Sequence, residues 1–180
     1  DGNKHYYTDQ TDNYLQKNYQ LLLNHSFSTA WNLNVALHYT KGDGYYEEYK
    51  PGSSLVEYGL KPFNPDGTET NESDLVRQKK MDNKFGGGVF SLNYTGNRLT
   101  ASLGGGLNQY RGNNFGKVTW VKNYIGNLSP EHEYYRNKSK KTDGNIYLKA
   151  NYDLTSTLSA YADLQYRHID YTIDGVNDKY

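Results

Sequence analysis

The sequence predicts an all-β fold of about six antiparallel strands joined as up-and-down hairpins. Hydrophobic and polar residues alternate with a period of two along three stretches, as in strands with one apolar and one polar face. Short runs of turn-forming residues interrupt each stretch. Only 35% of the residues are hydrophobic and the mean hydropathy is −0.97, but the 20 Tyr residues favour strands over disorder. We expect hairpins at about residues 16–40, 85–108 and 142–171.

The first hairpin reverses at Thr29-Ala30-Trp31-Asn32. Between its apolar residues lie mainly polar ones, such as Gln20, Asn24 and Asn34. Its expected apolar face consists of alternate residues on both strands: Tyr19, Leu21, Leu23, His25, Phe27, Leu33, Val35, Leu37 and Tyr39.

The second hairpin turns at Gly96-Asn97. This pair suits a two-residue primed turn, because Gly adopts a positive φ at little cost. If Thr95 pairs with Arg98, Gly88 falls opposite Gly105. Glycines paired across strands predict a bend, or the close approach of another element.

The third hairpin turns at Thr155-Ser156-Thr157. Pairing Leu154 with Leu158 sorts the apolar and polar residues onto separate faces. The same register sets Lys149 opposite Asp163, and opposite charges in that position contribute about 0.2–1 kcal/mol. The charge pair therefore supports this register.

Two longer links, at about residues 41–83 and 109–141, connect the three hairpins and are rich in Gly, Asn and Tyr. In an up-and-down sheet, one end then carries short turns and the other carries long loops. Compact domains usually need connections of about 4–6 residues, whereas this asymmetry is typical of outer-membrane barrels. We interpret residues 1–180 as a single segment of a transmembrane β-barrel and as a piece of a longer protein.

The expected apolar face leaves a second interpretation open. It carries no charged side chain in the strand cores and has Tyr near its ends, as does a lipid-facing band about 25 Å tall. A soluble β-sandwich also has an apolar, alternating inner face. The uneven loops and the polar second face favour the barrel. The alternative is a soluble β-sandwich that acts as a binding or adhesion module through its Tyr-rich loops.

Composition and spacing exclude several classes of function. Twenty basic and 20 acidic residues cancel, so nucleic acid is not an expected partner. Cys is absent, and the five His residues show no ligand spacing, so we expect no metal and no cofactor. No apolar run reaches the about 18 residues of a membrane helix. No nucleophile, base and orienting group occur together, so we do not expect an enzyme.

Aromatic residues of the two expected loops are the best candidates for ligand binding. Loops on a rigid scaffold commonly carry binding residues, and buried aromatic residues dominate many interfaces. Packing of the loops against each other is an equally good explanation. The candidates are Tyr45, Tyr46, Tyr49, Tyr110, Trp120, Tyr124, Tyr134 and Tyr135.

Four stretches of the chain resemble TonB-dependent outer-membrane receptors of Bacteroides type. They are Ser73–Tyr94, which contains Phe85-Gly86-Gly87-Gly88-Val89-Phe90, then Gly104–Tyr110, Phe115–Val118, and Lys149–Asp170, which ends in Leu164-Gln165-Tyr166-Arg167-His168-Ile169-Asp170. The resemblance covers about residues 14–175 and concerns the barrel of the family.

The resemblance implies a location in the bacterial outer membrane and a role in nutrient uptake. The family has a barrel of about 22 strands filled by a plug, and its TonB box couples import to the TonB complex. The resemblance implies import of a scarce nutrient such as an iron chelate, haem, cobalamin or a glycan. Expected partners are membrane lipid, the TonB complex through a plug that this chain lacks, and a surface lipoprotein. The outermost strands, 19–27 and 158–166, would be unpaired edges through which copies self-associate.

Overall fold

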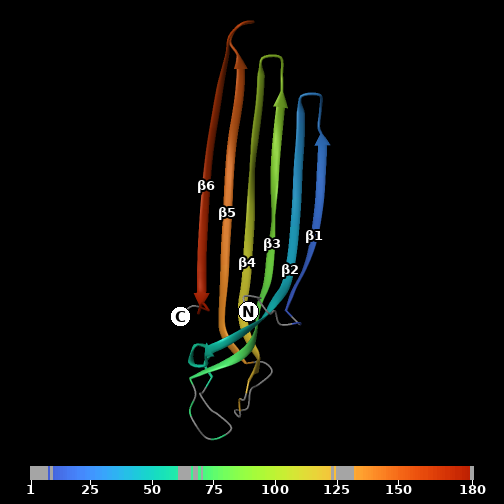
Figure 1. Ribbon diagram of the computed structural model, residues 1–180. Helices are drawn as coiled ribbons and strands as arrows, with labels where there is room; N and C mark the ends of the chain where they lie inside the picture. The colour runs from blue at the N-terminus through green and yellow to red at the C-terminus, as the bar shows by residue number, and fades with distance from the viewer. Residues whose placement is uncertain are drawn as a thin grey trace, which may run out of the picture.

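The structure, a computed structural model, describes residues 8, 10–60, 66, 69, 71–122, 124 and 132–178. Six strands form one antiparallel sheet in the order β1-β2-β3-β4-β5-β6 (Figure 1). The fold is therefore all-β and up-and-down, as predicted. The strands are β1 (Thr11–Ser26), β2 (Trp31–Ser54), β3 (Glu72–Thr95), β4 (Leu99–Val121), β5 (Glu133–Asp153) and β6 (Ser159–Gly175), and a 3-10 turn, η1 (Val56–Tyr58), follows β2.

The predicted register of the third hairpin is confirmed, and so is the predicted apolar face of the first hairpin. Tyr19 pairs with Tyr39 across β1 and β2. Lys149 pairs with Asp163 across β5 and β6, where Lys149 Nζ lies 3.8 Å from Asp163 Oδ2. The first turn is displaced from its predicted position, because β2 already begins at Trp31 and residues 27–30 make the connection.

The predicted register of the second hairpin is wrong by two residues. Thr95 pairs with Thr100, so Gly88 lies opposite Leu107 and Gly105 lies opposite Phe90. The primed turn is also absent, since the described glycines with positive φ do not include Gly96. A slip of two residues keeps every side chain on its own face, and alternation cannot detect it.

The strands extend much farther than the sequence predicted. The expected loops at 41–83 and 109–141 consist mostly of strand: β2 continues to Ser54, β3 begins at Glu72, β4 continues to Val121 and β5 begins at Glu133. The connections are therefore 55–71 and 122–132. Polar residues occupy both faces of these extensions, so hydrophobic periodicity gave no signal there, and the backbone pairing continues regardless.

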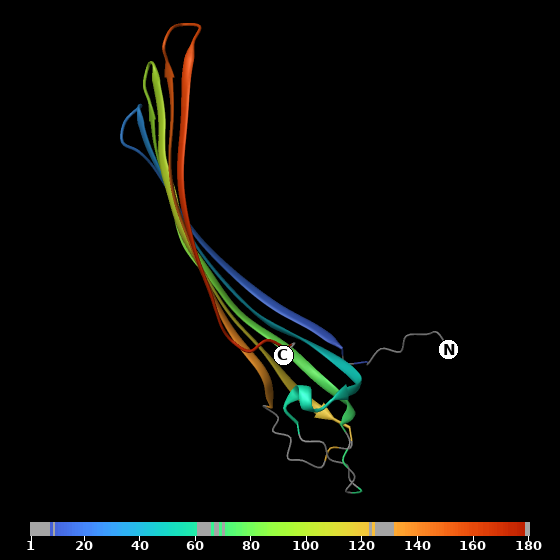
Figure 2. The same cartoon turned by 90° about the vertical axis from the view of Figure 1, so that its left-hand side faces the viewer.

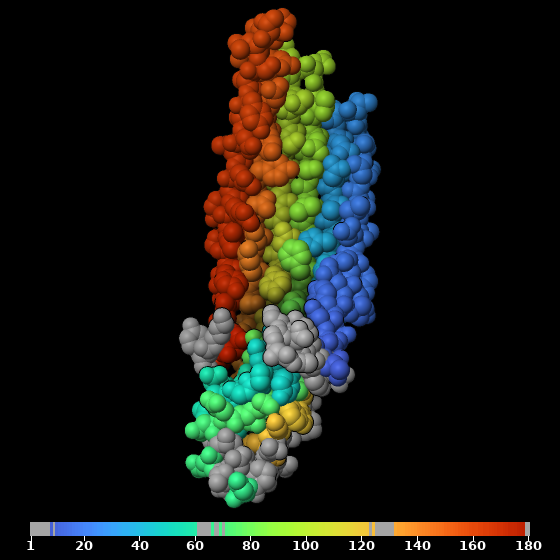
Figure 3. All heavy atoms as spheres, in the orientation of Figure 1, coloured from blue at the N-terminus to red at the C-terminus, as the bar shows by residue number. Residues whose placement is uncertain are grey.

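The sheet is a single open layer that bends along its length (Figure 2). The three hairpin turns lie at one end, which we call the turn end. The η1 segment covers part of the sheet at the other end, which we call the far end (Figures 1 and 3). A small hydrophobic cluster at the far end, the far-end core, contains Leu55, Tyr58, Leu60, Leu75, Val118 and Val121.

No second sheet covers the first among the described residues. The sandwich interpretation requires two sheets packed face to face about 10 Å apart, so its architecture is not found in this part of the chain. No helix among the described residues is long and apolar enough to cross a membrane.

Candidate functional site

The cross-strand registers sort the side chains onto two faces. We call the face that carries Leu21, Leu37 and Leu148 the apolar face, and the opposite one the polar face. His25 pairs with Leu33, which lies on the apolar face, and His38 pairs with Gln20, which lies on the polar face. The two histidines are therefore on opposite faces and do not converge on one site.

A belt of apolar side chains, the apolar band, crosses all six strands on the apolar face near the turn end. On the edge strands these side chains are highly accessible, with Leu21 65% and Leu164 69% exposed, and on the inner strands Leu37 and Phe90 are 48% and 40% exposed. Along β2 the band runs from Trp31 to Tyr39, which at about 3.3 Å per residue is about 26 Å. Its large members are Tyr19, Leu21, Leu23, Trp31, Leu33, Val35, Leu37, Tyr39, Phe90, Leu92, Tyr94, Leu99, Leu103, Leu107, Ile146, Leu148, Tyr152, Leu164 and Tyr166.

The apolar band is slanted relative to the rows of paired residues. A row is a series of residues that pair directly across neighbouring strands. The row that begins at Tyr19 on β1 ends at Asp170 on β6, but the last apolar residue of the band on β6 is Tyr166, four residues away. At the turn end, the row of Trp31 reaches Ala162, and apolar residues continue four residues farther, to Leu158. Four residues are about 13 Å over about 24 Å of sheet width, a slope of about 30°. Barrel strands tilt by about 35–45°, so a level layer around a barrel wall is also slanted, by a somewhat larger angle than this band.

The polar face next to the apolar band carries short side chains that bond to one another. Asn34 Nδ2 donates to Ser91 Oγ at 3.3 Å, and Ser102 Oγ donates to Asn93 Oδ1 at 2.7 Å. His38 Nε2 and Asn108 Oδ1 are hydrogen-bonded at 2.8 Å. The first two contacts join neighbouring strands, and the third reaches from β2 to β4 across Gly87 of β3.

Side chains explain the close approach that the glycine runs predicted. A Cβ on Gly104 would collide with the ring of Tyr147, which lies over it from β5. A Cβ on Gly87 would collide with Asn108 from β4. No separate element is needed to account for these glycines, since adjacent strands supply the approaching groups.

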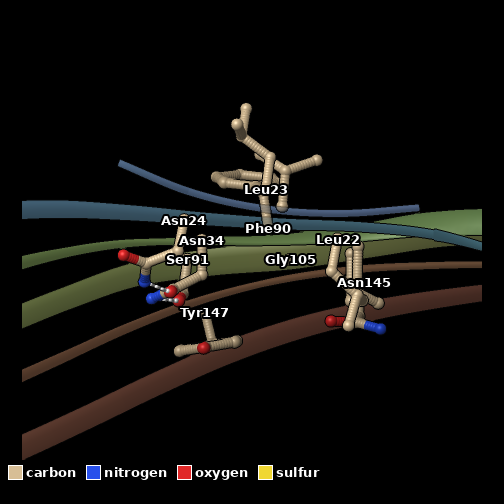
Figure 4. A pocket seen from close by; sticks show the side chains of 12 residues that line it. Leu22, Leu23, Asn24, Asn34, Phe90, Ser91, Gly105, Asn145 and Tyr147 are labelled. Carbon is tan, nitrogen blue, oxygen red and sulfur yellow. Dashed lines mark hydrogen bonds between the residues drawn. The ribbon is translucent and has the colours of Figure 1, made fainter. Parts of the chain in front are cut away.

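A hollow in the middle of the sheet does not form a ligand cavity. Its lining side chains belong to both faces: Leu23 and Phe90 project to one side of the strands, and Asn145 and Tyr147 to the other (Figure 4). A ligand could reach only one of these groups at a time, because the backbone separates them.

The far end of the polar face holds the most buried polar cluster. Arg77 Nε donates to Glu48 Oε1 at 2.7 Å, and Arg77 Nη1 donates to Tyr58 Oη at 3.0 Å. Burial alone would raise the pKa of Glu48, but the hydrogen bond and the charge of Arg77 outweigh burial and hold that pKa below its usual value. His132 Nε2 lies 2.6 Å from the backbone oxygen of Tyr58, so it holds η1 against the sheet.

Aromatic rings extend this cluster. The rings of Tyr58 and Tyr134 meet edge to face with their centroids 4.7 Å apart, and those of Tyr134 and Tyr135 do so at 4.9 Å. Burial raises the pKa of the Tyr134 phenol. Lys79 forms an ion pair with Asp178 beside them. Tyr58 and Tyr135 are only 5% and 8% exposed, so these rings pack against one another at the far end and leave little aromatic surface for a ligand.

The structure divides the eight predicted aromatic candidates into separate places. Seven lie on strands rather than in loops, and Tyr124 packs against the far-end core from a connection. Four lie on the polar face: Tyr46, Tyr110, Tyr134 and Tyr135. Three lie on the other face: Tyr45, Tyr49 and Trp120. The eight therefore do not form one site.

Sequence reasoning missed the role of Arg77 and Glu48. These residues face each other across β3 and β2, but the pairing becomes visible only when both strands continue through the region predicted as a loop. No group of three His, Asp or Glu side chains in the described part of the chain could hold a metal ion. No protein-family model and no curated protein sequence matches this chain.

Proposed function

We propose that the chain forms part of the wall of a bacterial outer-membrane β-barrel, and that this barrel is a TonB-dependent receptor for a scarce nutrient. The apolar band is the observation that carries the proposal. Monomeric soluble proteins rarely expose contiguous apolar patches larger than a few hundred Å², and this one crosses six strands. Lipid is the partner that would cover it.

The dimensions of the apolar band support a membrane layer. Its length along β2 is about 26 Å, which at a slope of about 30° is a height of about 23 Å, close to the apolar band of about 25 Å on transmembrane barrels. Tyr19, Tyr39 and Tyr166 lie at the end of the band nearer the far end, where such barrels carry an aromatic girdle. The slant of the band fits tilted strands in a closed wall.

The polar face would then line the barrel interior. Tyr46 and Tyr110 lie on this face beyond the apolar band. There they would face a nutrient such as an iron chelate, haem, cobalamin or a glycan before it passes inward. The receptor assignment rests on the resemblance of Ser73–Tyr94 and Lys149–Asp170 to that family, and it implies coupling to the TonB complex through a plug.

The two Trp residues provide a direct test. Trp31 belongs to the apolar band, and Trp120 lies on the same side of the sheet at the far end. We expect lipids brominated on their acyl chains to quench the fluorescence of Trp31 strongly and that of Trp120 weakly. The measurement uses the 180-residue chain in vesicles as Trp120→Phe and Trp31→Phe variants, each with one remaining Trp.

Equal and weak quenching of both residues would rule out membrane insertion of this face. The β-sandwich module predicts that result, together with a monomer that stays soluble without detergent. A second measurement concerns the receptor itself: growth on a single iron, cobalamin or glycan source should depend on the gene. If deletion of the gene leaves growth unchanged on every such source, the proposed receptor function is wrong. The proposal that the chain is part of a barrel wall would not be affected.

A further inference from the structure

A continuous row of positive charge crosses five of the six strands on the apolar face, on the far-end side of the apolar band. Lys17 pairs with Lys41, Lys41 with Lys84, Lys84 with Arg111, and Arg111 with Lys140. We call these five residues the basic row. All five are exposed, and none forms a salt bridge with another described residue. The positive charges of the row are therefore not neutralised by direct ion pairs among the described residues.

This arrangement is unfavourable in the isolated chain. Like charges directly opposite each other on adjacent strands destabilise a sheet. Salt does not remove the repulsion, since paired Cβ atoms are about 5 Å apart and the screening length is about 8 Å at physiological ionic strength. The next row of the same face toward the far end contains Asp43, Asp82 and Asp174 with one cation, Lys138, so it offsets part of this charge. An anionic partner would offset the repulsion.

We propose that the basic row binds phosphate groups of lipid headgroups in the membrane layer that covers the apolar band; this rests on the proposed membrane location. Lys17 and Lys41 lie two residues beyond Tyr19 and Tyr39, about 7 Å along the strands. Phosphates lie directly outside the hydrocarbon layer, at the level that these side chains reach. The apolar band and the basic row thus match the two parts of an anionic lipid.

A hollow on the same face supports binding along the row. Four cations, Lys84, Arg111, Lys138 and Lys140, line it together with two carboxylates, Asp82 and Asp174. Lys140 lies six residues beyond Ile146, about 20 Å along β5, so this end of the row is farther from the apolar band. Lys17 and Lys41 are therefore expected to contribute most to binding a simple phospholipid.

The test compares spin-labelled phosphatidic acid with spin-labelled phosphatidylcholine around the 180-residue chain in phosphatidylcholine vesicles. Electron paramagnetic resonance gives the preference for one lipid at the protein surface. Juxtamembrane cations contribute about 1 kcal/mol each, or about fivefold. We expect the unmodified chain to prefer phosphatidic acid by at least about fivefold, and the triple variant Lys17→Gln, Lys41→Gln, Lys84→Gln to show a ratio near one.

Two further variants control for folding and total charge. The charge-preserving triple Lys17→Arg, Lys41→Arg, Lys84→Arg should keep the preference. The matched triple Arg98→Gln, Lys141→Gln, Lys149→Gln removes the same charge at the turn and on the polar face, and it should also keep the preference. An equal loss in the matched triple would overturn the proposal, because total charge would then explain it.

The remaining outcomes separate this inference from the proposed function. If Trp31 is quenched by brominated lipid but the unmodified chain shows no preference, the chain lies in the membrane and the basic row is not a headgroup site. If soluble glycerol phosphate abolishes the preference at millimolar concentration, the row binds free phosphate esters and the lipid assignment is wrong. If Trp31 is not quenched, the proposed function itself fails.

Discussion

Arg77 is the residue that joins β3, β2 and η1 at the far end. Its guanidinium bonds to the Glu48 carboxylate and to the Tyr58 hydroxyl, and its side chain is only 14% exposed. The exposed pair Arg136–Glu133 is more accessible, with Arg136 at 38%. Charged hydrogen bonds contribute about 1.5–3 kcal/mol when they are shielded, whereas exposed ion pairs contribute about 0–1 kcal/mol.

The far-end core should therefore loosen in acid. The pKa of Glu48 is lowered in the folded chain, so its contribution is complete above the unfolded value of about 4.3 and is lost as pH falls through the lower folded value. Nuclear magnetic resonance shifts of the Arg77 side chain and of the Leu60 amide should report this change below about pH 4.

A Glu48→Gln variant serves as the control for that titration. It should show the loosened far-end core already at neutral pH, and the acid transition at Leu60 should disappear. Glu133→Gln, at the exposed pair, should leave both unchanged. An acid transition that persists in Glu48→Gln would assign it to another carboxylate, such as Asp74, whose pKa the hydrogen bond from Tyr49 lowers.

For single strands, the alternation of apolar and polar residues predicted which face each side chain takes. It did not predict the strand segments that are polar on both faces. Leu21, Leu37 and Leu148 marked the apolar face correctly, because a period of two fixes which face a side chain takes. Segments such as Lys41–Glu47 have polar residues on both faces, so nothing in their pattern distinguishes a strand from a loop. The Glu48–Arg77 pair was hidden for the same reason.

The register of β3 against β4 can be tested by cross-linking. The chain has no Cys, so introduced pairs are unambiguous. Asn93 and Ser102 are directly opposite and hydrogen-bonded, and Asn93→Cys with Ser102→Cys should react efficiently with a short thiol cross-linker. The register expected from the turn would instead favour Asn93→Cys with Thr100→Cys. Faster reaction of the second pair would show that the hairpin closes through the tighter turn.

For the whole molecule, the open sheet leaves two strands with a neighbour on one side only. β1 and β6 are the edges of the sheet, and a long exposed edge is a template for pairing with another chain. Because successive strands alternate in direction, β6 of one copy beside β1 of the next would continue the antiparallel order. Such head-to-tail contacts can close into rings, whereas β1 beside β1 would give only a dimer.

Single cysteines on the two edges distinguish these assemblies. Leu23 on β1 and Leu164 on β6 are 55% and 69% exposed on the apolar face. If the 180-residue chain associates head to tail in detergent, mixing Leu23→Cys with Leu164→Cys should give mixed disulfide dimers on oxidation, while either variant alone gives few. Ser91→Cys on the central strand β3 is the matched control and should stay monomeric. Dimers from Leu23→Cys alone would indicate β1–β1 pairing, and cross-linking no greater than in Ser91→Cys would show that neither edge is used.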